Sequence, residues 1–182
     1  MVDREIREAL CIVLENKYAK VRIMDEFVIG KARADIVTVT DSLTGYEIKG
    51  DSDSYTRLPT QVKEYDRYFQ QNYLVVGKSH SKSAAEHIPP YWGIVCVSES
   101  GKGVQVKTLR KAAHNPQFSI KKQLSVLWRM ELVHILQANK LPKCSGKRKA
   151  YIRGYLIERI SQDTLRLQIC EELFERDWTV FA

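Results

Sequence analysis

The sequence predicts an α/β protein with a mixed central sheet, flanking helices and a C-terminal helical extension. Three observations lead to this prediction: β-branched runs between residues 21 and 49, a nearly all-apolar run at 73–76, and helical periodicity after residue 118. Strands and helices alternate in the first part of the chain, which excludes an all-α or an all-β protein. We therefore expect a core at 1–112 and a helical extension at 113–182.

The first part of the chain predicts one helix followed by three strands. Residues 3–20 carry apolar side chains at helical spacing, and Asp3 is the expected N-cap. Gly30 indicates a turn between the first two strands, and residues 41–45 resemble a hairpin loop before the third. The predicted strands are 21–29, 33–40 and 46–49.

The remaining elements follow from the same patterns. Pro59 stands near the start of a helix that extends to about residue 71, since proline is favoured in the first turn. Three further strands are expected at 73–76, 92–97 and 104–109. Helices are expected at 124–139 and 147–160, and Ser161 is the expected cap of a last helix. Trp128 and Trp178 are expected in the core.

Composition excludes several classes of protein. No apolar run approaches the roughly 20 residues that span a bilayer, and the N-terminus lacks the apolar segment of a signal peptide, so we expect a cytoplasmic protein without membrane contact. The four cysteines form no Cys-x-x-Cys pair, which favours reduced thiols over a disulfide framework or a thiolate zinc site.

Charge is distributed unevenly along the chain. Residues 101–160 contain 14 Lys and Arg against 2 Asp and Glu, whereas the remainder of the chain carries a net charge of −5. A strongly basic stretch suits a polyanion such as DNA, and a separate group of carboxylates suits a divalent cation. A solvated basic face would produce the first half of this pattern as well.

The most informative residues for chemistry are Asp35, Glu47 and Lys49. Side chains alternate faces along a strand, so Glu47 and Lys49 point the same way. A hairpin between the second and third strands would bring Asp35 near Glu47. Two carboxylates and a nearby carbonyl oxygen suit Mg²⁺ or Mn²⁺. The alternative is a simple cluster of surface charges on a strand.

These residues carry a resemblance to a known superfamily. Arg33-Ala34-Asp35 followed by Gly45-Tyr46-Glu47-Ile48-Lys49 resembles the motif of the PD-(D/E)XK nucleases. Gln61 and Tyr65, four residues apart on the next helix, resemble the Gln-x-x-x-Tyr element of its RecB-like branch. Further short segments, Arg57-Leu58-Pro59 and Trp92-Gly93-Ile94 among them, resemble a little-characterised bacterial or phage branch.

The resemblance implies a restriction-endonuclease-like fold and a metal site. Asp35 and Glu47 would be metal ligands for Mg²⁺ or Mn²⁺. The additional acidic ligand would be Glu26 on the first strand, with Glu5 on the first helix as the second choice. Asp51 and Asp53 are either extra ligands or, as we favour, residues that stabilise a turn.

The resemblance also implies the reaction, which is hydrolysis of DNA phosphodiester bonds. Lys49 would be the catalytic lysine, and Gln61 would touch the substrate backbone or brace the metal site. Tyr65 would pack behind the site or contact phosphate. We expect Lys49→Ala to remove activity and leave folding intact. The corresponding roles are DNA repair, restriction or phage DNA processing.

A basic segment near the C-terminus is the expected DNA-binding surface. Its residues Lys143, Lys147, Arg148, Lys149 and Arg153 would contact phosphates and give salt-sensitive affinity without base specificity. Two other functions stay open. One is a nucleic-acid-binding or partner-binding module that does not cleave, and the other is a nuclease subunit that acts in a homodimer or larger complex.

Overall fold

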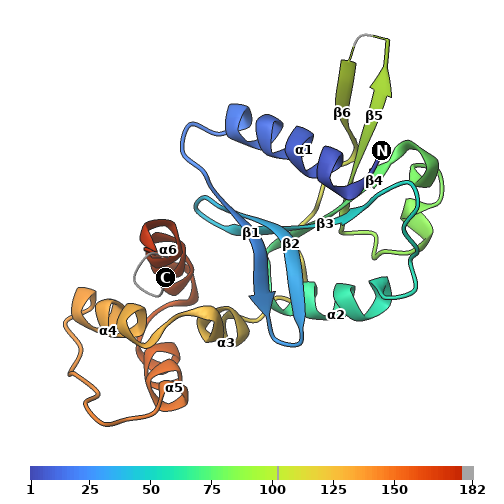
Figure 1. The fold of residues 1–182 in the computed structure, drawn as a ribbon. Coiled ribbons are helices and arrows are strands. Elements are labelled where there is room, and N and C mark those ends of the chain that lie inside the picture. The colour runs from blue at the N-terminus through green and yellow to red at the C-terminus, as the bar shows by residue number, and fades with distance from the viewer. Residues whose placement is uncertain (102, 178–182) are drawn as a thin grey trace. The chain divides into compact units, whose positions relative to one another are not determined.

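The computed structural model describes residues 1–101 and 103–177, and it divides the chain into two compact units (Figure 1). The first unit is Met1–Phe118 and the second is Ser119–Ala182. The predicted α/β class, with a mixed sheet and a C-terminal helical segment, is confirmed. Trp178 lies outside the described residues. Within the described ranges, none of the helices combines the length and the apolar character needed to cross a bilayer.

The first unit is built on one six-stranded sheet in the order β1-β2-β3-β4-β5-β6. Neighbours β1, β2 and β3 are antiparallel, β3, β4 and β5 are parallel, and β6 returns antiparallel to β5. The strands are β1 (Arg22–Ile29), β2 (Ala32–Val39), β3 (Leu43–Lys49), β4 (Gln71–Gly77), β5 (Gly93–Ser100) and β6 (Gly103–Arg110). The helical elements are α1 (Asp3–Lys17), α2 (Leu58–Tyr68) and the short turns η1 (Lys78–His80) and η2 (Ala84–Glu86).

Helix α2 connects the parallel strands β3 and β4, because parallel neighbours need a crossover between their ends. Pro59 stands in the first turn of α2, where a backbone N–H has no carbonyl partner within the helix. The N–H that proline lacks therefore costs α2 no hydrogen bond. Gly45 on β3 lets the helix approach closely, since a Cβ there would lie 2.4 Å from the ring of Phe69. Figure 1 shows α1 and α2 on opposite faces of the sheet.

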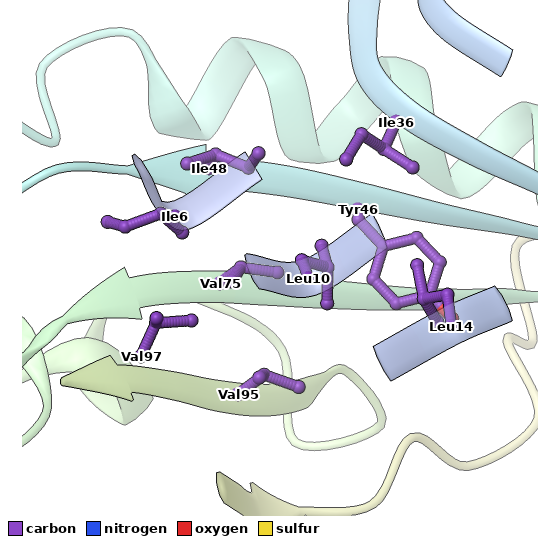
Figure 2. Packing of buried hydrophobic residues seen from close by; sticks show 9 residues of the cluster. All are labelled: Ile6, Leu10, Leu14, Ile36, Tyr46, Ile48, Val75, Val95 and Val97. Carbon is purple, nitrogen blue, oxygen red and sulfur yellow. The ribbon is translucent and has the colours of Figure 1, made fainter. Parts of the chain in front are cut away.

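The face of the sheet beneath α1 forms an apolar core (Figure 2). Three side chains of α1 point at the sheet with helical spacing, which confirms the predicted amphipathic helix. All members of this cluster are at most 5% exposed. They are Ile6, Leu10, Leu14, Ile36, Tyr46, Ile48, Val75, Val95 and Val97.

Two details of this unit differ from the sequence-based expectation. The N-cap of α1 is Val2 and not Asp3, because the carboxylate of Glu5 accepts the Val2 backbone N–H at 3.0 Å. The third strand begins at Leu43, so the connection from β2 is shorter than the predicted loop. Gly30 takes a positive φ of 55° in the predicted turn between β1 and β2.

The second unit is helical. Its elements are α3 (Ile120–Gln123), η3 (Leu124–Val126), α4 (Arg129–Ala138), α5 (Lys149–Arg159) and α6 (Gln162–Glu175). The Ser161 side chain accepts the backbone N–H of Thr164, which confirms the predicted cap of α6. A buried pair braces the unit, since the Arg176 guanidinium donates to both carboxylate oxygens of Glu131 at 2.6 Å.

The predicted single helix at 124–139 is wrong, because the backbone is extended at Leu127 and Trp128. The Glu131 carboxylate accepts the Trp128 backbone N–H at 2.6 Å and so helps to start α4 at this point. Leu124, Leu127, Leu132, Ile135 and Leu136 are nevertheless all buried. Trp128, which was expected in the core, is only half-buried. The sequence therefore predicted most of the buried positions, and it did not predict the break between them.

Candidate functional site

Alternation along β3 separates its polar side chains from its apolar ones. Tyr46 and Ile48 join the core beneath α1, whereas Glu47 and Lys49 contact α2 residues on the other face of the sheet. Glu47 is 1% exposed and Lys49 is 5% exposed. A buried charge destabilises the folded state unless it is paired and hydrogen-bonded, so Glu47 and Lys49 both need partners close by.

The Glu47 carboxylate accepts hydrogen bonds from three side chains. The Lys49 ammonium donates to its Oε1 at 2.6 Å, and the Gln61 amide donates to the same oxygen. The Tyr65 hydroxyl donates to Oε2 at 2.8 Å. Lys49 also donates to Gln61 Oε1 at 3.3 Å. The structure thus brings together Glu47, Lys49 and Gln61, the central part of the predicted catalytic set.

Tyr65 has a different place from the one expected of a DNA contact. Its side chain is fully buried, so it is not accessible to phosphate. Its hydroxyl contacts Glu47 and also accepts the Asp35 backbone N–H at 3.1 Å. We therefore correct the DNA-binding assignment of Tyr65 and describe it as a residue that positions the two carboxylates, consistent with the alternative that it packs behind the site.

Asp35 lies beside this group on the neighbouring strand β2. Its Oδ2 accepts the Ile48 backbone N–H at 2.7 Å. Burial, together with the negative charge of Glu47, raises the pKa of Asp35 to about 7. Its side chain is 20% exposed, more than that of Glu47 or Lys49. Asp35 is therefore the member of the group that is most accessible to an incoming ion or ligand.

A second polar network holds α2 against the sheet. The Asp66 carboxylate accepts the Trp92 indole N–H at 2.8 Å, the Tyr91 hydroxyl at 2.7 Å and the Asn72 amide at 3.1 Å. Burial raises the pKa of Asp66. Because Asp66 follows Tyr65 directly, these bonds fix the helix turn that carries the candidate site. No sequence pattern predicted this network, because Tyr91 and Trp92 are distant from Asp66 along the chain.

Arg7 of α1 is a site residue that sequence reasoning missed. Its guanidinium donates to the Asp35 backbone oxygen at 2.8 Å and forms ion pairs with Asp25 and with Glu26, the latter at 3.2 Å. One Asp35 carboxylate oxygen lies 3.7 Å from the same guanidinium. Arg7 follows the core residue Ile6, and no periodicity distinguishes it from an ordinary surface arginine.

The structure does not assemble the predicted three-carboxylate metal site. Glu26 lies opposite Asp35 in the β1–β2 register, but its carboxylate pairs with Arg7 and Arg33. Glu5 instead caps α1. Across residues 1–101 and 103–177, no group of three His, Cys, Asp or Glu side chains is arranged to hold a metal ion. The third carboxylate is missing from the site because the guanidinium groups of Arg7 and Arg33 bind and neutralise Glu26.

Glu26 also has an unusual backbone, with a positive φ of 53° inside a strand. Non-glycine residues rarely adopt this region, and such strain is common at functional sites. The pairs on either side of it, Asp25 with Ile36 and Phe27 with Ala34, keep one register. The distortion is therefore local to the position that faces Asp35.

Asp51 and Asp53 stabilise the loop after β3. The Asp51 carboxylate accepts the Ser79 backbone N–H at 2.9 Å and also pairs with the amino group of Met1. The Asp53 carboxylate accepts the Gly50 N–H at 2.7 Å. The hydrogen bonds from the Met1 amino group and from Ser79 lower the pKa of Asp51 well below its usual range. This arrangement supports the favoured interpretation of the pair as turn residues.

An aromatic cluster beyond the carboxyl ends of β3 and β4 was also missed. The Tyr55 ring stacks on His87, with centroids 4.0 Å apart, and meets the edge of His80 at 4.8 Å. Tyr55 carried no pattern that linked it to them, because the contact joins two loops distant in sequence.

The predicted basic DNA-binding residues all belong to the second unit. Lys143, Lys147 and Arg148 are exposed, and Lys149 and Arg153 are half-buried near the start of α5. Burial and the positive charge of Arg153 lower the pKa of Lys149. DNA contact by these side chains stays a prediction.

The comparisons with known proteins include a solved structure and a sequence relative. A solved structure of SfsA from Pyrococcus furiosus in complex with Ca²⁺ matches 61% of each chain at 14% identity, with a TM-score of 0.33, a similarity too low to support an assignment. Protein cII of Enterobacteria phage P4 is 26% identical over 113 residues. That match spans 60% of this chain and 43% of the length of the phage protein.

A family model covers almost the whole chain. The model of bacteriophage P4 protein cII matches residues 3–178, which include both units. The match agrees with the predicted bacterial or phage origin, and it names a family other than the RecB-like nucleases suggested by Gln61 and Tyr65. The chain belongs to the family of bacteriophage P4 protein cII.

Proposed function

We propose that this protein is a metal-dependent deoxyribonuclease of the PD-(D/E)XK type. The main support for this proposal is that Asp35 lies beside the buried Glu47–Lys49 pair. Gln61 forms hydrogen bonds with both members of that pair. The residue types, their alternation on β3 and the helix that follows all fit the superfamily motif. Phage DNA processing, restriction and repair are the corresponding biological roles.

The donor set of the site fits a hard divalent cation. Asp35 and Glu47 are adjacent carboxylates whose repulsion contributes to the raised pKa of Asp35. A positive ion between them would relieve that repulsion, and oxygen ligands suit Mg²⁺ or Mn²⁺. Asp35 and Glu47 would hold the cation. When bound, it would act as a Lewis acid toward the phosphate and would favour formation of the nucleophile.

The remaining groups have roles that follow from their contacts. The Lys49 ammonium would offset negative charge that develops on the phosphate, since it is fixed in a buried position by Glu47 and Gln61. Gln61 would keep the Glu47 carboxylate and the Lys49 ammonium in one orientation. Tyr65 would hold Glu47 Oε2 from behind and position the Asp35 backbone.

Arg7 supports a second candidate function, a DNA-binding or partner-binding module that does not cleave. Its guanidinium neutralises Asp25 and Glu26 and lies near Asp35, on the side where a third metal ligand was expected. A fixed positive charge in this place would compete with a cation for the same carboxylates. Arg7→Met separates the functions: in a nuclease it should change the affinity for Mn²⁺, and in a silent module it should have no metal-dependent effect.

The direct test combines metal binding with cleavage. Titration calorimetry with Mn²⁺ should show binding at millimolar metal or below, and Glu47→Gln should weaken it. A panel of linear, nicked, branched and single-stranded DNA, with RNA as a further substrate, should show metal-dependent cleavage of at least one DNA. A folded protein that binds no metal and cleaves none of these would favour the silent module.

A further inference from the structure

Helix α5 carries a strip of aromatic and cationic side chains that the candidate site does not use. Its members are Lys147, Tyr151, Tyr155 and Arg159, four residues apart, and we call them the α5 strip. Side chains at this spacing are neighbours on a helix surface. The strip therefore forms a continuous row along α5 and the residues just before it.

The contacts within the strip are regular. The Lys147 ammonium lies 5.2 Å from the centroid of the Tyr151 ring. The rings of Tyr151 and Tyr155 are stacked, with centroids 6.1 Å apart and planes inclined by 22°. The Arg159 guanidinium lies 3.6 Å from the centroid of Tyr155. Tyr151 thus lies between Lys147 and Tyr155, and Tyr155 lies between Tyr151 and Arg159.

The strip is distinct from the side of α5 that packs in the second unit. Ile152 and Leu156 are fully buried, whereas Tyr151 is 50% exposed. A tyrosine in this place adds little to the apolar core, so core packing does not explain why a large aromatic residue stands there. Apart from Tyr155, only the ammonium of Lys147, an exposed residue, lies over this ring among the described side chains, so a flat partner that displaces the ammonium could stack on the ring.

Gly154 leaves the surface beside Tyr151 open. A Cβ at this position would meet no atom within 4 Å, so close packing does not require glycine here. Glycine inside a helix is also less stable than alanine. Because residues three apart are neighbours on a helix, the missing side chain uncovers the flank of the Tyr151 ring.

Charge identifies the kind of partner. Residues 140–157 contain six Lys and Arg and no Asp or Glu, and Glu158, which pairs with Arg159 at 3.0 Å, ends this stretch. Single-stranded nucleic acids offer phosphates for such cations and free base faces for aromatic rings. In a duplex the base faces are stacked inside, and only phosphates and groove edges are accessible.

We propose that the α5 strip binds single-stranded DNA, with a base stacking on Tyr151 in place of the Lys147 ammonium and phosphates contacting Lys147 and its basic neighbours, while Tyr155 supports the Tyr151 ring from its other side. The inference rests on the proposed function in taking DNA as the polyanion, and it does not depend on cleavage. It assigns the second unit a preference for unpaired strands in place of a simple affinity for the DNA backbone.

The test is fluorescence anisotropy with the full chain in EDTA, so that binding is measured without cleavage. Three probes of about 20 nucleotides are compared: single-stranded DNA, the matching duplex, and a strand of the same length without bases. We expect single-stranded DNA to bind about tenfold more tightly than either other probe. Tyr151→Ala should lower the affinity for single-stranded DNA about tenfold and leave the other two nearly unchanged.

Two matched variants keep the result interpretable. Tyr151→Phe retains the ring and should bind like the parent, and Gly154→Leu should weaken single-strand binding by covering the flank of the ring. Circular dichroism should show that all three variants are folded. Equal binding of the three probes, no binding, or a folded Tyr151→Ala that binds single strands normally would overturn the proposal. A cleavage assay with Mn²⁺ reports separately on the nuclease, whose failure leaves this inference intact.

Discussion

The two units of this chain carry charge in opposite ways. In the first unit, Glu47 and Lys49 are buried and bonded to each other, and Gln61 and Tyr65 complete their surroundings. In the second, basic side chains around the start of α5 are exposed or half-buried. Buried charges depend on a few fixed partners, whereas exposed charges act through their sum and are screened by salt. Single substitutions should therefore have large effects in one unit and small ones in the other.

The largest expected effect comes from breaking the Glu47–Lys49 pair. Lys49→Ala should lower the free energy of unfolding by about 3–5 kcal/mol, since it leaves the Glu47 carboxylate buried without its cation. This revises the sequence-based expectation that Lys49→Ala leaves folding intact. Urea denaturation gives the measurement. Glu47→Gln combined with Lys49→Ala should recover much of the loss, and an additive double variant would contradict the coupling.

The next effect is a pH dependence of stability from Asp35. Its pKa is about 7 in the folded chain against an ordinary value of 3.8, so between roughly pH 4 and pH 7 the folded state binds the extra proton. The free energy of unfolding should therefore fall as pH rises through that window, by about 4 kcal/mol, and level off above it.

The measurement is urea denaturation at several pH values without divalent cations. Asp35→Asn is the matched variant, because it keeps an oxygen that accepts the Ile48 N–H and lacks the titrating proton. Its stability should depend less on pH than that of the parent. Identical slopes for the two proteins would show that Asp35 has an ordinary pKa.

A smaller effect is expected from Tyr65→Phe. The substitution keeps the buried ring and removes the hydroxyl that donates to Glu47 and accepts the Asp35 N–H. Leaving buried groups without a partner should cost about 2 kcal/mol of unfolding free energy. Thermal unfolding monitors this loss. A Tyr65→Phe protein as stable as the parent would argue against the positioning role.

The smallest effects on stability belong to the exposed basic residues of the second unit. Lys143→Ala or Arg148→Ala should change the free energy of unfolding by no more than about 0.5 kcal/mol. Each should nevertheless weaken DNA binding and reduce its dependence on salt concentration. Binding measured across a range of salt would reveal this, and an unchanged salt dependence in both variants would remove these side chains from the DNA-binding surface.

The sequence predicted those parts of the site that depend on local periodicity. Glu47 and Lys49 share a face because they are two apart on a strand, and Gln61 and Tyr65 share one because they are four apart on a helix. The position of Asp35 required only the correct hairpin pairing of β2 with β3. These relations are set by backbone geometry over short distances.

Contacts between distant elements were not predictable in the same way. Arg7 reaches the site from α1, and its ion pairs with Asp25 and Glu26 occupy the carboxylate expected to bind metal. The Glu131 carboxylate helps to start α4 after the break at Leu127 and Trp128, and apolar periodicity continues across this break. In both cases the structure depends on which partner a charged side chain binds, and the sequence pattern does not show which of several possible partners this is.

The most direct test of the central claim is cleavage of supercoiled plasmid with Mn²⁺ by the parent and by Glu47→Gln, both shown to be folded. The account predicts metal-dependent nicking by the parent that EDTA stops. It predicts activity lower by at least about a hundredfold in the variant, since the substitution neutralises the carboxylate that pairs with Lys49 and that would hold the cation. Equal cleavage by the two proteins, or none by a folded parent, would contradict the proposed nuclease.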